Sequence, residues 1–207
     1  MLVAQVRPYR GVDAAERLAH RRRQLLESGL DLLGSESDSA ELTVRTICGQ
    51  AGLTLRYFYE SFTDKDQFVA AVFDWVVADL TTSIQAAVSA APTKERNRAG
   101  MADLVRTIAA DARIGRFLVS SRANAMLVRR QAETGALLAM LYGQNVTAAL
   151  GLQQTERGKA TAHFAVGGVV QVINTWLAGD IGLDHDALVD QLALILDDLV
   201  DPELYRR

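Results

Sequence analysis

The sequence predicts an all-α protein in which a small N-terminal three-helix domain precedes a larger helical domain. Only three of the 207 residues are proline, and alanine, leucine and valine dominate the composition. Proline breaks helices, whereas alanine and leucine favour them. Apolar residues make up 49% of the chain, which is enough to form a sizeable core in one or two domains.

The N-terminal segment has a local excess of positive charge. Residues 1–25 contain six arginines against Asp13 and Glu16, although the formal net charge of the whole chain is −3. Contacts with phosphate depend on local rather than global charge. We expect residues 1–13 to form a flexible basic arm. A first helix should follow over about residues 14–33, with buried leucines along one face and three consecutive arginines near its middle.

Residues 43–62 have the pattern of two short helices joined by a tight turn. Thr43 is placed to cap the first helix, and Gly52 suits the left-handed conformation of the turn that ends it. Thr54 is placed to cap a second helix over residues 55–62. The buried face of the first helix is marked by apolar residues at helical spacing, namely Val44, Ile47, Cys48 and Ala51. This pattern is a helix-turn-helix, whose second helix can enter the major groove of DNA.

The second helix has an unusual surface for a purely structural element. Phe58 and Phe62 take its buried side, whereas arginine and tyrosine gather on the other side. Thr63 should cap the next helix, and Lys65 in the first turn of that helix opposes the helix dipole unless an anion docks there. A solvated surface lysine is the alternative interpretation. The residues expected to contact DNA are Thr43, Arg45, Thr54, Arg56, Tyr57, Tyr59 and Lys65.

Residues 14–75 resemble the DNA-binding signature of the TetR family of bacterial transcription regulators. The matching residues are Thr43, Ile47-Cys48, Ala51-Gly52, Thr54, Tyr59, Phe62, Thr63, Lys65-Asp66 and Phe68. Cys48 replaces the usual alanine, and Arg56 and Tyr57 stand where the family more often has small residues, which leaves the operator sequence open. The resemblance implies a helix-turn-helix DNA-binding domain over residues 14–67 and a ligand-binding and dimerisation domain over residues 68–207. The basic arm either reaches a neighbouring minor groove or is a loose tail.

Helical periodicity continues through the rest of the chain. The helix that begins near Asp64 should run to about Ala90, because Ala91-Pro92 then ends it. A polar stretch over residues 93–100 separates it from the C-terminal helices. These further helices are expected over residues 101–110, 113–120, 124–150, 158–178 and 184–200.

The last two of these helices have the composition of a subunit interface. Residues 158–179 are apolar on most sides and rich in glycine and alanine, so this helix must be buried. In the final helix, leucine and isoleucine recur at spacings of four, three and four residues. Both helices either pair with their copies in a four-helix bundle, as the resemblance favours, or close the core of one subunit. The expected dimer interface consists of Gly167, Val170, Leu188, Leu192, Ile195 and Leu199.

The middle helices carry many aliphatic and aromatic residues and few charges away from their outer faces. Most of these side chains must form core, but the resemblance implies a cavity for an effector. Its expected lining consists of Leu104, Phe117, Leu137, Leu141, Tyr142, Asn145, His163 and Asn174. We therefore expect a small, largely apolar effector that one or two polar groups orient.

No pattern typical of a catalytic or metal site appears in the sequence. His20, His163 and His185 lack the spacing of convergent metal ligands, and no cofactor is expected. Cys48 is the only cysteine, which excludes an internal disulfide and fits the reducing cytoplasm, and its place on an apolar stripe predicts a core position. Neither a secretion signal nor a membrane-spanning run is evident.

Together with these patterns, the resemblance to the TetR family implies a ligand-responsive transcription regulator. It would act as a homodimeric repressor that binds a near-palindromic DNA operator and is released by its effector, with activation as the alternative mode. An all-helical enzyme acting on a small apolar molecule is a second possibility, but the sequence shows no convergent catalytic groups. A third is a helical protein whose helix-turn-helix contacts another protein, and the exposed Arg56, Tyr57, Tyr59 and Lys65 weigh against it.

Overall fold

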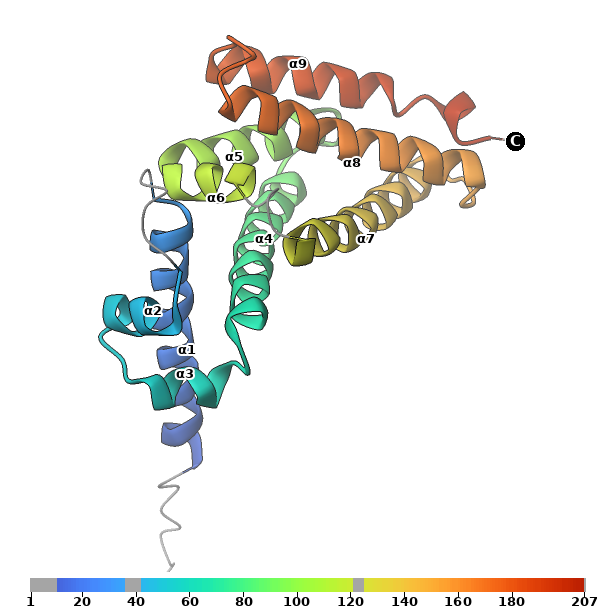
Figure 1. Ribbon diagram of the computed structural model, residues 1–207. Coiled ribbons are helices and arrows are strands. Elements are labelled where there is room, and N and C mark those ends of the chain that lie inside the picture. The colour runs from blue at the N-terminus through green and yellow to red at the C-terminus, as the bar shows by residue number, and fades with distance from the viewer. Residues whose placement is uncertain (1–10, 36–41, 121–124, 207) are drawn as a thin grey trace, which may run out of the picture.

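The computed structural model describes residues 11–35, 42–120 and 125–206, and every element in this part of the chain is helical (Figure 1). The all-α prediction is therefore confirmed. The α-helices are α1 (Gly11–Leu33), α2 (Val44–Ala51), α3 (Leu55–Ser61), α4 (Lys65–Ala90), α5 (Arg96–Ala110), α6 (Ala112–Ser120), α7 (Ala125–Leu150), α8 (Glu156–Leu177) and α9 (His185–Asp198). The described residues also form the short 3₁₀ helices η1 (Thr93–Glu95) and η3 (Pro202–Leu204). Most of the expected basic arm, residues 1–10, lies outside the described residues.

An aromatic cluster holds the first three helices and the start of α4 together. The cluster consists of Phe58 in α3, Phe62 at the C-cap of α3 and Phe68 in α4. These side chains are almost fully buried, at 0%, 2% and 0% exposure. Their ring centroids lie 5.1 to 5.5 Å apart in tilted and edge-to-face arrangements, as aromatic pairs prefer. Leu25 of α1 and Ile47 of α2 are both fully buried in the same core. The short helices α2 and α3, which would be unstable alone, are therefore fixed by packing.

Helix α4 connects the N-terminal helices with the rest of the molecule. It begins beside α3 and continues without interruption to the second group of helices (Figure 1). It crosses α1 closely at Gly29, where an added Cβ would lie 2.6 Å from Phe68 and 2.7 Å from Val72. By length and composition α4 could also span a bilayer, but six of its apolar side chains are buried in the protein core, and soluble core helices pass the same test.

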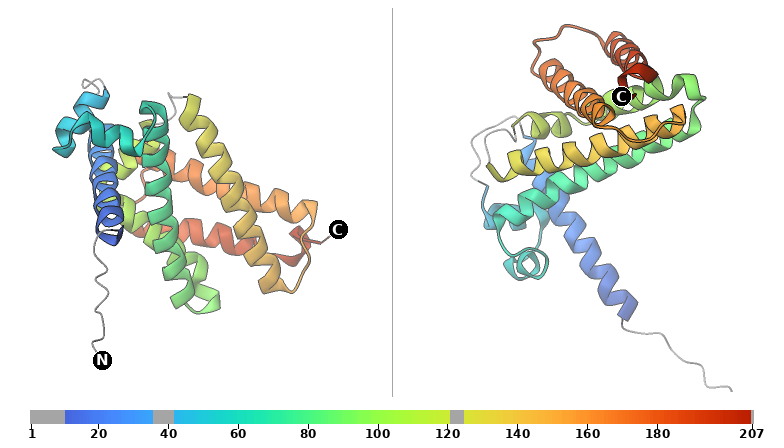
Figure 2. Two further views of the ribbon diagram at one scale, coloured as in Figure 1. Left: turned by 90° about the horizontal axis from the view of Figure 1, so that it is seen from below. Right: turned by 90° about the vertical axis from the view of Figure 1, so that its right-hand side faces the viewer.

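The remaining helices form a second layer at the far end of α4. Helix α7 runs beneath α8 there and packs against it, while α9 follows α8 across the same end of the molecule (Figures 1 and 2). Helix α5 packs against both α4 and α9. Polar bonds reinforce the helix contacts, since Arg130 of α7 donates to Asp74 of α4 at 2.8 Å and Arg98 of α5 donates to Asp190 of α9 at 2.9 Å.

Two expected capping residues behave differently from the sequence prediction. The cap of α4 is Asp64 rather than Thr63, because the Asp64 carboxylate accepts a hydrogen bond from the Gln67 N–H at 2.7 Å. Thr54 occupies the N-cap position of α3, but its side chain makes no capping bond.

The polar stretch over residues 93–100 also contains more helix than expected, because its polar side chains fit the exposed first turn of α5.

Candidate DNA-binding surface

The helix-turn-helix is built by local bonds that the sequence predicted. The Thr43 hydroxyl accepts from the Thr46 N–H at 3.1 Å, and the Thr46 hydroxyl accepts from the Thr43 N–H at 2.9 Å, which makes a reciprocal cap on α2. Gly52 ends α2 with a φ of 65°, in the left-handed region. The Leu53 N–H then donates to the Cys48 carbonyl at 2.9 Å and closes the turn. Helices α2 and α3 thus have a defined angle before any partner binds.

Helix α3 is clamped to α1 on one side and open to solvent on the other. Arg22 of α1 donates to the Ser61 carbonyl at 2.9 Å, and its guanidinium lies 4.4 Å from the centroid of the Phe62 ring. The opposite side of α3 carries Arg56 and Tyr59, and Tyr59 is 59% exposed. The side of α3 that faces away from the core is therefore free to meet a partner.

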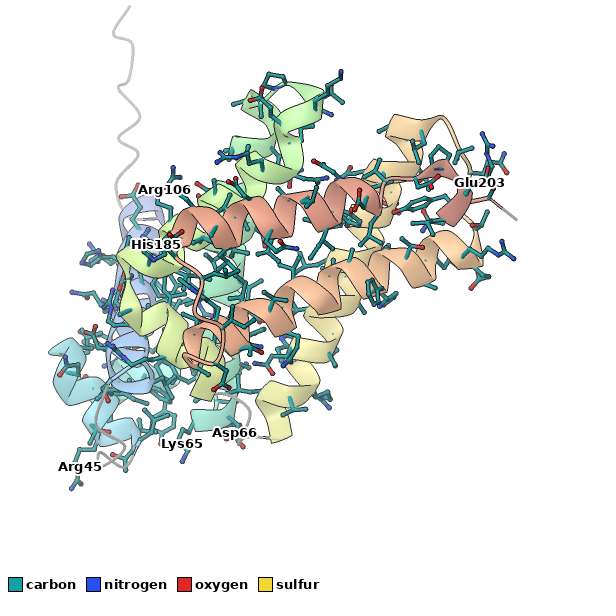
Figure 3. All side chains as sticks on the ribbon, turned by 90° about the horizontal axis from the view of Figure 1, so that it is seen from above. Arg45, Lys65, Asp66, Arg106, His185 and Glu203 are labelled. Carbon is teal, nitrogen blue, oxygen red and sulfur yellow. The ribbon has the colours of Figure 1, made fainter. Side chains whose placement is uncertain are left out.

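Two exposed cationic side chains lie on the helices that precede and follow α3 in the chain. Arg45 of α2 and Lys65, the first residue of α4, are both exposed, and Figure 3 shows both extending into open space at the same end of the molecule. Neither has a bonding partner among the residues that the structure describes. The Gln67 N–H at the N-terminus of α4 is already bonded to the Asp64 carboxylate, so a phosphate here would meet the Lys65 side chain rather than the helix backbone.

The seven residues predicted to contact DNA are not equally available. Arg45, Thr54, Arg56, Tyr59 and Lys65 are exposed. The hydroxyl of Thr43 is used in the α2 cap, and the ring of Tyr57 is half-buried beneath the Arg21 guanidinium, 4.3 Å from its centroid. These last two residues help to build the surface.

Sequence reasoning missed the residues that hold α3 in place. Arg21 and Arg22 of α1 and Glu60 of α3 make the contacts that fix its position, whereas the sequence pattern indicated only the charge of the arginines. The available signal was the run of three arginines at residues 21–23. Helical spacing sends such neighbours in different directions, so at least one had to face the protein.

The eight residues predicted to line an effector cavity do not meet in one place. Phe117 is 1% exposed and packs against Phe73 in the core, with ring centroids 6.5 Å apart. Leu137 and Leu141 lie on the outer face of α7, at 52% and 41% exposure. Asn145 and His163 are also exposed, while Leu104, Tyr142 and Asn174 are partly buried. The Tyr142 hydroxyl is buried without a hydrogen-bond partner, and burial raises its pKa above the usual value.

An open cleft of about 330 Å³ lies elsewhere, where α1 meets α4, α5 and α6. Its apolar lining includes Leu30 and Trp75, and its polar lining includes Glu27, Asp79 and Arg113. This cleft shares no lining residue with the predicted effector pocket.

The predicted dimer residues divide into two groups. Leu188 and Leu192 are 0% and 2% exposed within their own subunit, so they belong to its core. Gly167, Val170 and Ile195 are exposed, while Leu199 is half-buried. Phe164 of α8 and Leu194 of α9, which were not predicted, are 68% and 57% exposed. We call the exposed set Phe164, Gly167, Gly168, Val170, Leu194 and Ile195 the α8–α9 face.

Cys48 of α2 lies in the hydrophobic core of the protein, as the sequence predicted. It is 4% exposed, and burial raises the pKa of its thiol. Within residues 11–35, 42–120 and 125–206, no group of three or more histidine, cysteine or acidic side chains could hold a metal ion.

The architecture is similar to that of solved TetR-family transcriptional regulators. One from Syntrophomonas wolfei is 15% identical, with a TM-score of 0.72 over 88% of this chain and 95% of its own. One from a Rhodococcus species is 15% identical, with a TM-score of 0.71 over 88% of this chain and all of its own. FadR from Bacillus subtilis, solved in complex with stearoyl-CoA, is 16% identical, with a TM-score of 0.63 over 84% and 96%. No protein-family model and no curated protein matches this chain.

These structural similarities identify the fold of the chain. The chain has the fold of the TetR family, as the resemblance over residues 14–75 implied. At such low identities the likeness extends to the fold alone, so function depends on the surfaces of this chain.

Proposed function

We propose that this protein is a transcription regulator that represses its target genes and binds DNA through α3. Residues 14–67 would form the DNA-binding domain, and residues 68–207 would form the effector-binding and dimerisation domain. The protein would work in the cytoplasm and need no cofactor.

The observation that carries this proposal is the helix-turn-helix with its free cations. Helix α3 is bonded to α1, and Arg45 and Lys65, on the helices that precede and follow it in the chain, are exposed without partners in the described part of the chain. Phosphate contacts from these cations would set the register of α3 on the duplex. Arg56 and Tyr59, exposed on α3 itself, would then reach base edges and backbone in the major groove.

The α8–α9 face supports a homodimer. It combines two large exposed apolar side chains, Phe164 of α8 and Leu194 of α9, with the small residues Gly167 and Gly168 of α8. An added Cβ at Gly167 or Gly168 would meet nothing within 4 Å, so this part of α8 is open to a close-packed partner helix. A second copy would pair α8 and α9 with their symmetry mates in a four-helix bundle. Two copies of α3 would then meet the two halves of a near-palindromic operator.

The contacts between α6 and α1 support control by an effector. Arg113 of α6 forms an ion pair with Asp31 of α1, and Arg116 donates to the Gly34 carbonyl at 2.6 Å. A ligand that shifts α6 would thereby shift the N-terminal helices. The effector would be small and largely apolar, and the stearoyl-CoA complex of FadR is a precedent for an apolar chain in this fold. Release from DNA requires that the effector bind one arrangement more tightly than the other.

The test is a gel shift with the purified chain and the DNA upstream of its own gene. Wild-type protein should retard this DNA in the presence of excess random duplex, whereas a double variant with Arg45→Ala and Lys65→Ala should not. Arg129→Ala on α7, which removes one exposed cation far from α3, should bind normally. Equal retardation of upstream and random DNA by the wild type would contradict the proposal.

A further inference from the structure

One carboxylate on α3 joins two arginines from two helices. Glu60 Oε1 accepts from the Nε of Arg56, one turn earlier on α3, at 2.9 Å. Its other oxygen, Oε2, lies 3.8 Å from an Nη of Arg21 on α1. The guanidinium of Arg21 lies over the Tyr57 ring at 4.3 Å from the centroid. We call Arg21, Arg56, Tyr57 and Glu60 the Glu60 cluster.

The two arginines of this cluster differ in their exposure and in the number of contacts that restrain them. The Arg56 side chain is 84% exposed, and only its Nε is bonded, so its two terminal nitrogens point to solvent without partners among the described residues. The Arg21 side chain is 24% exposed, and its Nε is buried without a hydrogen-bond partner. Arg21 is therefore held by stacking and by a long ion pair, both of which depend on its planar guanidinium.

An acidic residue at this position is costly for a surface that meets DNA. Glu60 is exposed on α3, and its charge would repel the phosphates that Arg45 and Lys65 attract. Without Glu60, Arg56 would be free to turn towards the backbone, and the charge of Arg21 would no longer be paired, so binding to any sequence would strengthen. With Glu60, Arg56 keeps a restricted orientation in which its terminal nitrogens can approach one base pair as a bidentate donor.

We propose that Glu60 is a positioning residue for operator selectivity, which holds Arg56 for base reading and offsets the charge of Arg21 that would otherwise attract phosphate. This inference rests on the proposed operator binding through α3. In this role, Glu60 lowers the affinity for all DNA but raises the ratio of the affinity for operator DNA to the affinity for random DNA. Arg22, by contrast, bonds to the Ser61 backbone and has a purely structural role.

The variant Glu60→Gln keeps the size of the side chain and removes its charge. Affinity for random duplex should rise about fivefold to tenfold at 0.1 M salt, since one added phosphate contact steepens the salt slope by about 0.9. The ratio of operator to random affinity should fall at least about tenfold, because Arg56 loses its fixed orientation. Operators are first selected from a random duplex pool with the wild-type chain, and both affinities are then measured by fluorescence anisotropy across a salt series.

Two controls separate this role from a general effect of charge or folding. Glu133→Gln on α7 also removes a carboxylate that pairs with two arginines, but far from α3, and should leave both affinities unchanged. In an Arg56→Ala background, Glu60→Gln should still strengthen random binding but should not lower base preference further, because the pair acts as one unit. This comparison stays informative even if one single variant folds poorly.

Three outcomes would overturn the inference. An unchanged ratio and salt slope in Glu60→Gln would show that the carboxylate does not restrain the arginines. A changed preference at one base pair with no rise in random binding would mean that Glu60 itself reads a cytosine. Absence of any selected sequence with the wild-type chain would overturn the proposed function, and the inference would fall with it.

Discussion

Replacing Phe164 by alanine should separate the proposed dimer without unfolding the subunit. Phe164 is 68% exposed on α8, so the subunit gains little from its burial. In the dimer, the ring would lie against the symmetry-related helices. Its removal therefore changes association far more than folding.

The size of the effect follows from the exposed area. An aromatic side chain buries roughly 200 Å², so the exposed share of Phe164 that alanine would remove is about 100 Å² in each subunit. At about 25 cal/mol per Å², this loss is about 2.5 kcal/mol per subunit and about 5 kcal/mol per symmetric dimer. The dissociation constant should rise by about three to four orders of magnitude.

Sedimentation equilibrium measures this change directly. Wild type should be a dimer at micromolar concentration, and Phe164→Ala should be largely monomeric with an unchanged helical circular dichroism spectrum. Leu18→Ala is the matched control, because Leu18 is a 40% exposed apolar residue on α1, far from the α8–α9 face. A monomeric wild type, or a dimer that is equally stable in Phe164→Ala, would refute the reasoning.

Further variants test other parts of the account. Lys65→Ala should weaken all DNA sequences alike and lower the salt slope by about one, and an unchanged slope in the anisotropy series would remove Lys65 from the phosphate contacts. The hydrogen bond from the Gln67 N–H lowers the pKa of Asp64 in the folded protein. The ionised Asp64 therefore stabilises the fold above about pH 3.9, and this contribution is lost as the pH falls through the lowered pKa of the folded state. The difference in melting temperature between wild type and Asp64→Ala should disappear in strong acid. Arg113→Met should reduce hydrogen-exchange protection at the C-terminal end of α1 more than in α8, because it removes the ion pair with Asp31. Tyr142→Phe should leave chemical stability unchanged or raise it by up to about 1 kcal/mol, because the buried hydroxyl has no partner, and a marked loss would reveal one.

The helix-turn-helix could be predicted from the sequence because it depends on interactions between residues close together in the chain. The reciprocal cap at Thr43 and the left-handed Gly52 depend on neighbours within a few residues, so their spacing alone predicts them. The cap of α4 was misplaced by one residue because Thr63 and Asp64 are both good N-caps, and only the backbone geometry selects Asp64. Helix boundaries commonly shift in this way.

The residues that hold α3 in position could not be predicted in the same way. Arg21 and Glu60 are 39 residues apart, and their contact depends on the angle between α1 and α3. The same limit applies to the dimer prediction, since the spacing of Leu188 and Leu192 marks a buried face without saying whether the subunit or its copy buries it. The exposure of Leu137 and Leu141 could not be predicted either, because hydrophobicity does not distinguish the inner face of α7 from its outer face.

A hydroxyl-radical footprint of the upstream DNA tests the central claim most directly. The wild-type dimer should protect two symmetric segments whose centres lie one helical turn apart or a multiple of it, about 34–36 Å per turn, and Arg56→Ala should weaken both segments equally. Uniform protection along the duplex, or protection of a single unpaired segment, would contradict operator binding by two copies of α3.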